Sequence, residues 1–225
     1  MTTPLVELEG VRFSYPGPRS FQLEIQSLGI GAGERIACIG PSGSGKTTLV
    51  NLITGIETPQ TGVVRFGGQA ISAMADAARR RVRLRDVGMV FQEFELLEYL
   101  TGLDNILLAF ALGAPRDERA RARAEELARA CGIGQVVRRR PRRLSQGERQ
   151  RVAICRALVT SPMLVVADEP TGNLDPDTGG AVLDLLLEQV SSRGATLLMV
   201  THNHAVLDRF DRVIDMRDLT RGAVA

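Results

Sequence analysis

The sequence has no tryptophan, only three cysteines and a single lysine. Because the number of cysteines is odd and Cys38, Cys131 and Cys155 show no paired spacing, the sequence argues against a disulfide framework or a cysteine metal site and indicates reduced, buried thiols. It also lacks an apolar run approaching the roughly 18 residues that cross a bilayer. Residues 1–9 lack the basic and apolar regions of a secretion signal. These absences predict a chain that stays in the cytoplasm.

The net charge is also small, because 28 basic and 26 acidic side chains leave a formal charge of +2. Such a balance gives little support for a nucleic-acid-binding surface. Arginines gather at residues 79–85 and 138–143, but no aromatic residues are interleaved with them. We interpret both stretches as solvated faces rather than lipid or nucleic-acid sites, and we expect no nucleic-acid partner.

The one lysine, Lys46, stands apart because every other basic residue is an arginine. A coding bias toward arginine accounts for the others, and position 46 escapes it. The exception suggests a site that needs a slim ammonium group rather than a planar guanidinium.

The 225 residues, 44% of them hydrophobic, can bury one sizeable core with at most a smaller subdomain. Alternation from Leu5 to Tyr15 and from Phe21 to Ile25 predicts two strands of a small antiparallel sheet, joined by a turn at Pro16-Gly17-Pro18. Farther on, apolar strands alternate with helices, which predicts a mostly parallel sheet covered on both faces. We expect strands at 35–39, 62–66, 87–91, 163–167, 196–200 and 212–216, and helices at 46–55, 73–84, 101–112, 117–130, 145–160 and 178–190, with a short helix after residue 200.

The strand at 35–39 runs into Gly40-Pro-Ser-Gly-Ser-Gly-Lys46-Thr47 and then into a helix. Strand, glycine-rich loop and helix form the context of a phosphate loop. The glycines let successive N–H groups point inward, and the helix start adds its positive end. Lys46 would neutralise the terminal phosphates and Thr47 would hold magnesium. A glycine-rich turn that binds nothing is the weaker alternative.

Two acids, Asp168 and Glu169, end the apolar strand that begins at Leu164. Their position at the carboxyl edge of a parallel sheet is where open α/β folds bind ligands. Asp168 suits magnesium and Glu169 suits the attacking water. Taken alone, the two acids could equally well cap a strand.

Leu144-Ser145-Gln146-Gly147-Glu148 opens the helix expected at 145–160. Ser145, with Glu148 three residues later, has the pattern of a capping box. A helix start with a serine hydroxyl and a bare glycine is also a good docking surface for a phosphate. A single chain has no evident use for this second phosphate-docking helix.

Together with Tyr15, with Gln92 in Val90-Phe-Gln, and with His202 in Thr201-His, these motifs make the chain resemble the ABC ATPase family over nearly its whole length. The resemblance implies an α/β fold of the P-loop NTPase, ABC type, with a mostly parallel sheet core, a small antiparallel β subdomain and a helical insert. It implies a single domain, 1–225, in which the helical subdomain occupies about 93–160.

The resemblance also implies binding and hydrolysis of ATP with Mg²⁺. The catalytic residues would be Glu169, His202 and Lys46. Mg²⁺ would be held by Thr47, Gln92 and Asp168. Nucleotide contacts would come from Tyr15, Gly40, Pro41, Ser42, Gly43, Ser44, Gly45, Lys46, Thr47, Thr48, Gln92, Ser145, Gly147 and Glu148.

In this family two chains pack head to tail, so the resemblance implies a homodimer in which each ATP lies between the phosphate loop of one copy and Ser145 and Gly147 of the other. Residues around the motifs, among them Phe91-Gln92 and Ala167 to Asp175, are similar to those of lipoprotein-release, macrolide-efflux and cell-division ATPases. That similarity implies a transport or mechanotransmission ATPase, peripheral on the inner face of the cytoplasmic membrane. It would dock on a separate transmembrane permease through the groove between the Gln92 loop and the helical insert.

A soluble ABC ATPase of DNA repair or translation is the alternative. Repair members need a long coiled-coil insertion, but only about fifty residues separate Gln92 from Leu144. Translation members carry two ATPase units in one chain, and here there is one.

Several positions depart from the family pattern or carry weaker signals. Gln146 stands where glycine is usual, Glu148 where glutamine is usual, and Asn203 where aspartate often follows the histidine. Tyr15 could be a plain core aromatic instead of an adenine-stacking one. We interpret His204 as a partly exposed residue at a helix start, not as a second catalytic group.

Overall fold

A computed structural model describes residues 4–17 and 21–221. The chain divides into two compact units, one of residues 1–83 and 198–225 and the other of residues 84–197. The boundaries fall within α2 (Asp76–Asp86) and β8 (Thr196–Val200), so each of these elements is counted with both units. No helix in the described ranges combines the length and apolar character that a membrane span requires.

The first unit contains an antiparallel sheet, in agreement with the alternating pattern near the start of the chain. A Cβ on Gly62, whose φ is +83°, would lie 2.3 Å from the Gly10 carbonyl oxygen, so only glycine allows this approach of two strands. Of the predicted turn, Pro18 lies outside the described residues. The strand order is β2-β1-β4-β5, with bounds β1 (Val6–Ser14), β2 (Gln22–Ile30), β4 (Thr61–Phe66) and β5 (Gln69–Ala70).

The same unit holds the parallel strands that lead into the phosphate loop. Here the strand order is β8-β3-β9, and β3 (Arg35–Ile39) runs parallel to β9 (Arg212–Asp215). Residues 36–38 of β3 have no solvent exposure, as expected for a strand covered on both faces. The unit also contains α1 (Lys46–Ile53), η1 (Ile71–Ala73), η3 (His204–Arg209) and α8 (Met216–Arg221).

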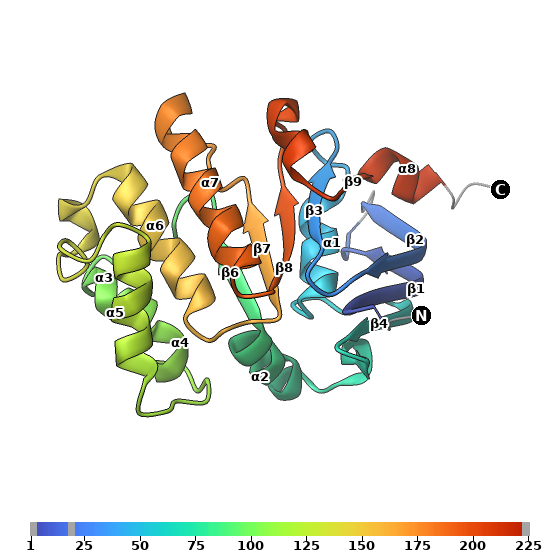
Figure 1. Ribbon diagram of the computed structural model, residues 1–225. Coiled ribbons are helices and arrows are strands. Elements are labelled where there is room, and N and C mark those ends of the chain that lie inside the picture. Colours follow the sequence, from blue (N-terminus) through green and yellow to red (C-terminus); the bar gives the residue numbers. More distant parts are fainter. Residues whose placement is uncertain (1–3, 18–20, 222–225) are drawn as a thin grey trace. The chain divides into compact units, whose positions relative to one another are not determined.

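The second unit is built around one helix, α6 (Gln146–Leu158), which contacts α3, α5, α7 and β6 (Figure 1). Its strands follow the order β6-β7-β8, with β6 (Val87–Val90) parallel to β7 (Leu164–Asp168). A Cβ on Gly88 would lie 2.2 Å from the Ala157 carbonyl oxygen, so glycine is needed where β6 packs on α6. The remaining helices are α3 (Gly102–Ile106), α4 (Leu108–Ala111), α5 (Ala120–Ala130), η2 (Pro141–Arg143) and α7 (Pro176–Ser191).

The helical segment differs from the sequence prediction in its details. The helix expected at 101–112 is two short helices, because the chain leaves helical geometry at Leu107, whose φ and ψ are −80° and 0°. The helix expected from residue 117 begins at Ala120. Asp117 precedes it in a turn, where its carboxylate accepts a hydrogen bond from Arg123 and its carbonyl accepts one from the Ala120 N–H. The side-chain hydrogen bond of Asp117 thus belongs to a turn that precedes α5, which accounts for the later start of this helix.

Candidate active site

The phosphate loop between β3 and α1 has a backbone that only glycine permits. Gly40, Gly43 and Gly45 have φ values of +153°, +77° and +96°. A Cβ on Gly40 would lie 2.7 Å from Ser44 Oγ, and one on Gly45 would lie 2.6 Å from Phe21 Cζ. The glycines are thus required by conformation and by space, as the sequence pattern predicts.

Lys46 lies across this loop. Its Nζ donates hydrogen bonds to the carbonyl oxygens of Gly40, at 2.7 Å, and Pro41, at 2.9 Å. Gly45 is the N-cap of α1 and offers no side chain to its first N–H groups, and Ser44 Oγ is buried without a hydrogen-bond partner in the described part of the chain. An ammonium, uncapped amides and an orphaned hydroxyl fit a chain of phosphates.

The next two threonines have different surroundings. Thr47 is exposed, whereas Thr48 is 4% exposed and its hydroxyl donates to the Tyr15 hydroxyl at 3.4 Å. Tyr15 is 36% exposed, and its ring meets that of Phe13 edge to face at 4.9 Å. Tyr15 therefore presents part of its ring to solvent, as a stacking role requires, while Thr48 holds the tyrosine hydroxyl.

His202 follows β8, and its backbone position is fixed against β3. The Thr201 N–H donates to the Cys38 carbonyl oxygen at 3.1 Å, which brings the carboxyl end of β8 beside the end of β3 that enters the phosphate loop. Asn203 caps η3 by accepting from the Ala205 N–H, and His204 is exposed at the start of that helix. The interpretation of His204 as an exposed residue at a helix start is confirmed.

In the second unit, the two acids follow the expected strand. Asp168 is the last residue of β7, and Glu169 follows it with a left-handed φ of +44°. The Gly172 N–H donates to the Glu169 carbonyl oxygen at 3.0 Å and closes the turn. A glutamate held at positive φ is strained, and such residues concentrate at functional sites.

Gln92 is joined to the segment after these acids by a pair of amide hydrogen bonds. Gln92 Nε2 donates to Asn173 Oδ1 at 3.3 Å, and Asn173 Nδ2 donates to the Gln92 carbonyl oxygen at 3.1 Å. A Cβ on Gly172 would lie 2.9 Å from Gln92 Nε2, so the two loops pack closely. Two motifs separated by about eighty residues thus meet within one unit.

The capping box that opens α6 is confirmed. The Ser145 hydroxyl accepts from the Glu148 N–H at 3.2 Å, and the Glu148 carboxylate accepts from the Ser145 N–H at 2.7 Å. Ser145 and Gln146 are exposed. A Cβ on Gly147 would lie 2.8 Å from Thr178 Cγ2, so this glycine also has a packing reason inside the chain.

Thr178 belongs to the first turn of α7, whose N-cap is Asp175. The Asp175 carboxylate accepts from the Thr178 N–H at 3.0 Å, and this hydrogen bond lowers the pKa of Asp175 below its usual value. The segment from Asn173 to Asp175 is therefore fixed at one end by the Gln92 loop and at the other by α7.

Two side chains of α6 that the sequence reasoning did not select hold the neighbouring loops. Gln150 is 0% exposed, and its Nε2 donates to the Pro170 carbonyl oxygen at 2.5 Å and approaches that of Phe91 at 3.5 Å. Arg156 donates to the carbonyl oxygens of Phe94 and Glu95, and its burial lowers its pKa. The signal was available: Gln150 is a polar residue on the same helical face as Ala153, Ile154 and Ala157, all buried.

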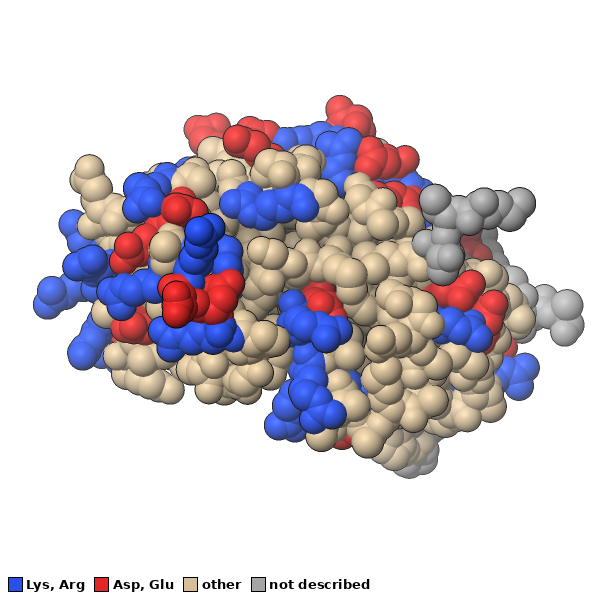
Figure 2. Space-filling view, turned by 60° about the horizontal axis from the view of Figure 1, so that its bottom comes forward, with Lys and Arg blue, Asp and Glu red and all other residues tan. Residues whose placement is uncertain are grey.

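The two arginine stretches differ. The arginines at 138–143 are exposed, in agreement with their interpretation as a solvated face, and Figure 2 shows basic and acidic side chains interspersed on the face it presents. In the other stretch that interpretation is wrong for Arg79 and Arg83. Both donate to the Gly55 carbonyl oxygen, just beyond α1, and burial lowers the pKa of Arg83. These two guanidinium groups satisfy the end of α1.

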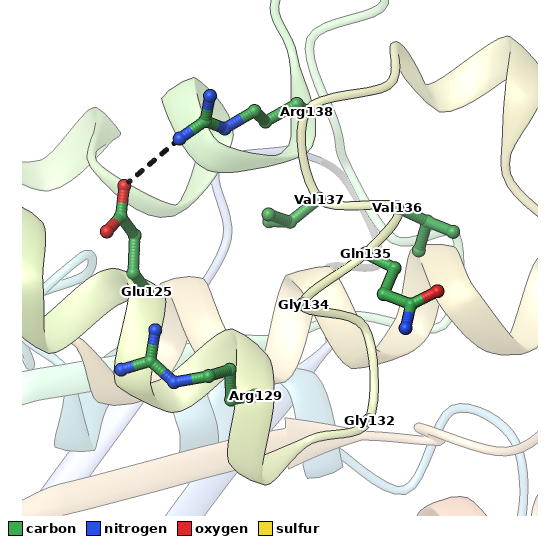
Figure 3. A pocket seen from close by; sticks show the side chains of 8 residues that line it. All are labelled: Glu125, Arg129, Gly132, Gly134, Gln135, Val136, Val137 and Arg138. Carbon is green, nitrogen blue, oxygen red and sulfur yellow. Dashed lines mark ion pairs between the residues drawn. The ribbon is translucent and has the colours of Figure 1, made fainter.

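A pocket of about 670 Å³ lies at the end of α5 and the loop after it (Figure 3). Glu125 and Arg138 form an ion pair at 3.8 Å at one side of it, and both side chains are drawn toward each other in Figure 3. None of the residues predicted to bind ATP or Mg²⁺ lines this pocket. It is therefore not part of the predicted nucleotide site.

The predicted site residues are divided between the two units. The first unit contains Tyr15, the phosphate loop with Thr48, and His202; the second contains Gln92, Ser145, Gly147, Glu148, Asp168 and Glu169. The cysteines of both units are free and buried, as predicted. Thus each unit carries a locally ordered group of polar residues at the ends of its strands.

Comparison with known proteins identifies the family. The family description "ABC transporter" matches residues 23–172. The lipoprotein-releasing system ATP-binding protein LolD of Anaeromyxobacter dehalogenans is 45% identical over 97% of this chain and 92% of its own length. LolD of Maricaulis maris is 43% identical over 85% of this chain and 84% of its own.

Solved structures agree with this assignment. A dimeric post-hydrolysis structure of the ATP-binding cassette MJ0796, bound to ADP and Pi, has a TM-score of 0.81 and 33% identity and covers 93% of both chains. The protein cbiO1 of Clostridium perfringens is described as part of the ABC transporter complex cbiONQ. Its structure has a TM-score of 0.84 and 25% identity over 95% of this chain and 85% of its own. The predicted fold and the resemblance to the lipoprotein-release group are confirmed, and the chain belongs to the ABC transporter family as an ATPase that powers transport.

Proposed function

We propose that two copies of this chain pair head to tail and hydrolyse ATP with Mg²⁺ at two shared sites. The observation that carries this proposal is the phosphate loop, whose backbone only glycine permits. Lys46, the buried Ser44 hydroxyl and the uncapped start of α1 all belong to this loop and are suited to binding phosphate. Ser145 and Gly147, at the start of α6, would complete the loop of the other copy. The similar cassette MJ0796 is described as dimeric, which supports the pairing of two copies.

The residues proposed for Mg²⁺ fit that ion chemically. Thr47 offers an exposed hydroxyl, Asp168 a carboxylate, and Gln92 an amide oxygen, since its Nε2 is engaged by Asn173. Oxygen donors of these types suit Mg²⁺, which supplies positive charge against the phosphate oxygens when bound. The three residues are the proposed metal ligands.

The proposed catalytic roles follow from charge and position. Glu169 polarises the attacking water, His202 contacts the terminal phosphate, and Lys46 neutralises the phosphate charge. Tyr15 stacks on the adenine with its exposed face. Most of the rate enhancement would come from positioning and electrostatic stabilisation, because phosphoryl transfer asks little covalent chemistry of the protein.

We further propose that the chain is one ABC ATPase domain with a helical subdomain at about 93–160, and that it docks on a separate transmembrane permease at the inner face of the cytoplasmic membrane. The names of the LolD relatives and of the cbiONQ complex support a multisubunit machine. A pocket of about 710 Å³ in the second unit is lined by Tyr99, 69% exposed, and by the arginines at 138–143. It is the proposed docking surface, because its lining residues belong to the helical segment and Tyr99 lies only a few residues after Gln92 in the chain.

The head-to-tail arrangement is tested by complementation. Lys46→Ala removes the phosphate contact and Ser145→Arg obstructs the helix start, so each variant alone should be inactive. In a mixed head-to-tail dimer both lesions fall in one site and the other site is intact. Mixing should therefore restore about a quarter of the wild-type ATPase rate, since half of randomly paired dimers are mixed and each has one intact site. No recovery in mixtures that do form mixed dimers would exclude the shared site.

The docking proposal has its own experiment. The chain is co-expressed with the membrane proteins encoded beside it, solubilised in detergent and purified by a tag on the ATPase. A membrane protein should co-purify and alter the ATPase rate. A Tyr99→Ala/Arg142→Glu variant should lose it while the rate of the isolated chain stays unchanged. Association that is undiminished by the double substitution would place docking elsewhere.

A further inference from the structure

The buried glutamine Gln150 has none of the catalytic or binding roles proposed above. Gln150 lies on α6, is 0% exposed, and donates through Nε2 to the Pro170 carbonyl oxygen at 2.5 Å, with the Phe91 carbonyl oxygen at 3.5 Å, the limit of a hydrogen bond. Its Oε1 is buried without a partner in residues 4–17 and 21–221. Burying an amide that is only partly satisfied is costly, so a leucine would suit stability as well or better.

The two carbonyl groups belong to the neighbours of proposed active-site residues. Pro170 follows Glu169, and Phe91 precedes Gln92. Glu169 is held at a φ of +44°, a conformation that persists only when its surroundings fix it. A single amide therefore restrains both the turn that carries the proposed general base and the loop that carries a proposed Mg²⁺ ligand.

Gln150 also connects these loops to the start of its own helix. It follows the capping box of Ser145 and Glu148 by less than one turn of α6. The same two loops are joined a second time by the amide pair of Gln92 and Asn173. Helix start, catalytic turn and Gln92 loop thus share one hydrogen-bonded network inside the second unit.

We propose that Gln150 is a positioning residue for ATP hydrolysis: its amide holds the backbone next to Glu169 and next to Gln92, so that both residues keep a fixed position relative to the start of α6. The proposal rests on the roles proposed above for Glu169 and Gln92. It concerns the hydrolytic step, because the phosphate loop that binds ATP lies in the other unit.

The test compares two buried glutamines of the same unit. Gln150→Leu removes the amide in question. Gln189→Leu is the matched control: Gln189 is 6% exposed on α7, and its Oε1 accepts from Arg193 rather than touching either loop. For Gln150→Leu we expect kcat about tenfold lower, with the Kd for ATP within about twofold of wild type. For Gln189→Leu we expect both values to match wild type.

Double variants of Gln150 and Asn173 distinguish a positioning role from a merely structural one. If Gln150 acts by fixing the Gln92 loop, combining Gln150→Leu with Asn173→Ala should lower kcat less than the product of the separate effects. Gln189→Leu with Asn173→Ala should be multiplicative. Bound ATP per chain and the unfolding midpoint are measured for every variant, and Gln150→Asn, whose amide is one methylene shorter, replaces Gln150→Leu if the latter fails to fold.

Three results overturn the proposal: a kcat for the Gln150 variants within twofold of wild type, an equal loss in Gln189→Leu, or purely multiplicative effects with Asn173→Ala. None of these depends on how two copies pair. The complementation of Lys46→Ala by Ser145→Arg reports on that pairing separately, so failure of the dimer proposal and failure of this one are distinguishable.

Discussion

The phosphate loop and the region around α6 both hold polar groups in place near the ends of strands. They differ in which atoms do the holding. The loop does it with backbone: three glycines at positive φ and one lysine that bonds carbonyls five and six residues before it. The α6 region does it with side-chain amides whose partners are far along the chain, as with Gln92 and Asn173 or Gln150 and Phe91. Local geometry can be deduced from a short motif, whereas the second arrangement exists only in the folded unit.

The largest effect is expected when the proposed catalytic group of the α6 region is removed while the phosphate loop stays intact. Glu169→Gln should lower kcat by about 100-fold or more, the range of a lost general base, while the Kd for ATP changes little. With ATP present, the variant should accumulate as a dimer in size-exclusion chromatography. Asp184→Asn, on the exposed side of α7, serves as a control that should change neither property. A Glu169→Gln enzyme as fast as wild type would remove the general-base role.

The second largest effect is expected from a substitution in the phosphate loop, and it concerns the affinity for ATP. Lys46→Arg keeps the charge, but a branched planar guanidinium does not match the site where Nζ meets the carbonyl oxygens of Gly40 and Pro41. We expect a loss of about 2–3 kcal/mol in ATP binding, from the charged hydrogen bonds that are disturbed, measured by direct titration. Arg80→Lys, at an exposed position of α2, should leave the affinity unchanged. If Lys46→Arg binds ATP with normal affinity, the site does not require an ammonium group, and the single lysine at this position has no such explanation.

A third prediction compares one glycine from each region. Gly45→Ala meets both a positive φ and the Phe21 ring, so no single change nearby should rescue it. Gly147→Ala meets only the Thr178 methyl group, and overpacking of this kind costs about 1–3 kcal/mol. Gly147→Ala/Thr178→Ser, which removes that methyl, should recover most of the lost unfolding free energy in urea titrations. The two glycines would not differ in the way proposed if nearby substitutions restored the unfolding free energy of both variants equally, or of neither.

The smallest effect lies at the opposite end of β3. The Arg35 guanidinium donates to Asp211 at 2.6 Å and lowers the pKa of that carboxyl. A lowered pKa stabilises the fold above the ordinary carboxyl range and loses this contribution as pH falls through the folded-state pKa. Because the pair is largely exposed, Asp211→Asn should cost less than about 1 kcal/mol at pH 7. The difference from wild type should vanish in urea titrations at acidic pH; a difference that grows there would have the wrong sign.

The sequence by itself determined the elements and the chemistry whose physics is local. Glycine spacing followed by Lys46, the capping box of Ser145 and Glu148, and the apolar strands ending in Asp168 were all deducible, because each depends on residues within one turn or one strand. The late start of α5 was not deducible, since the hydrogen bond between Asp117 and Arg123 forms only in the folded chain. The break at Leu107 was not deducible either, because neither proline nor glycine stands there to mark it.

Only the tertiary structure decided which distant groups share a hydrogen bond. It showed that Arg79 and Arg83 satisfy the end of α1 rather than forming a solvated face, and that Gly147 is packed against Thr178. It also brought Gln150 to the carbonyls beside Glu169 and Gln92. A buried amide can take any nearby carbonyl as its acceptor, so its partner depends on how helices and strands pack, and no spacing in the sequence records that choice.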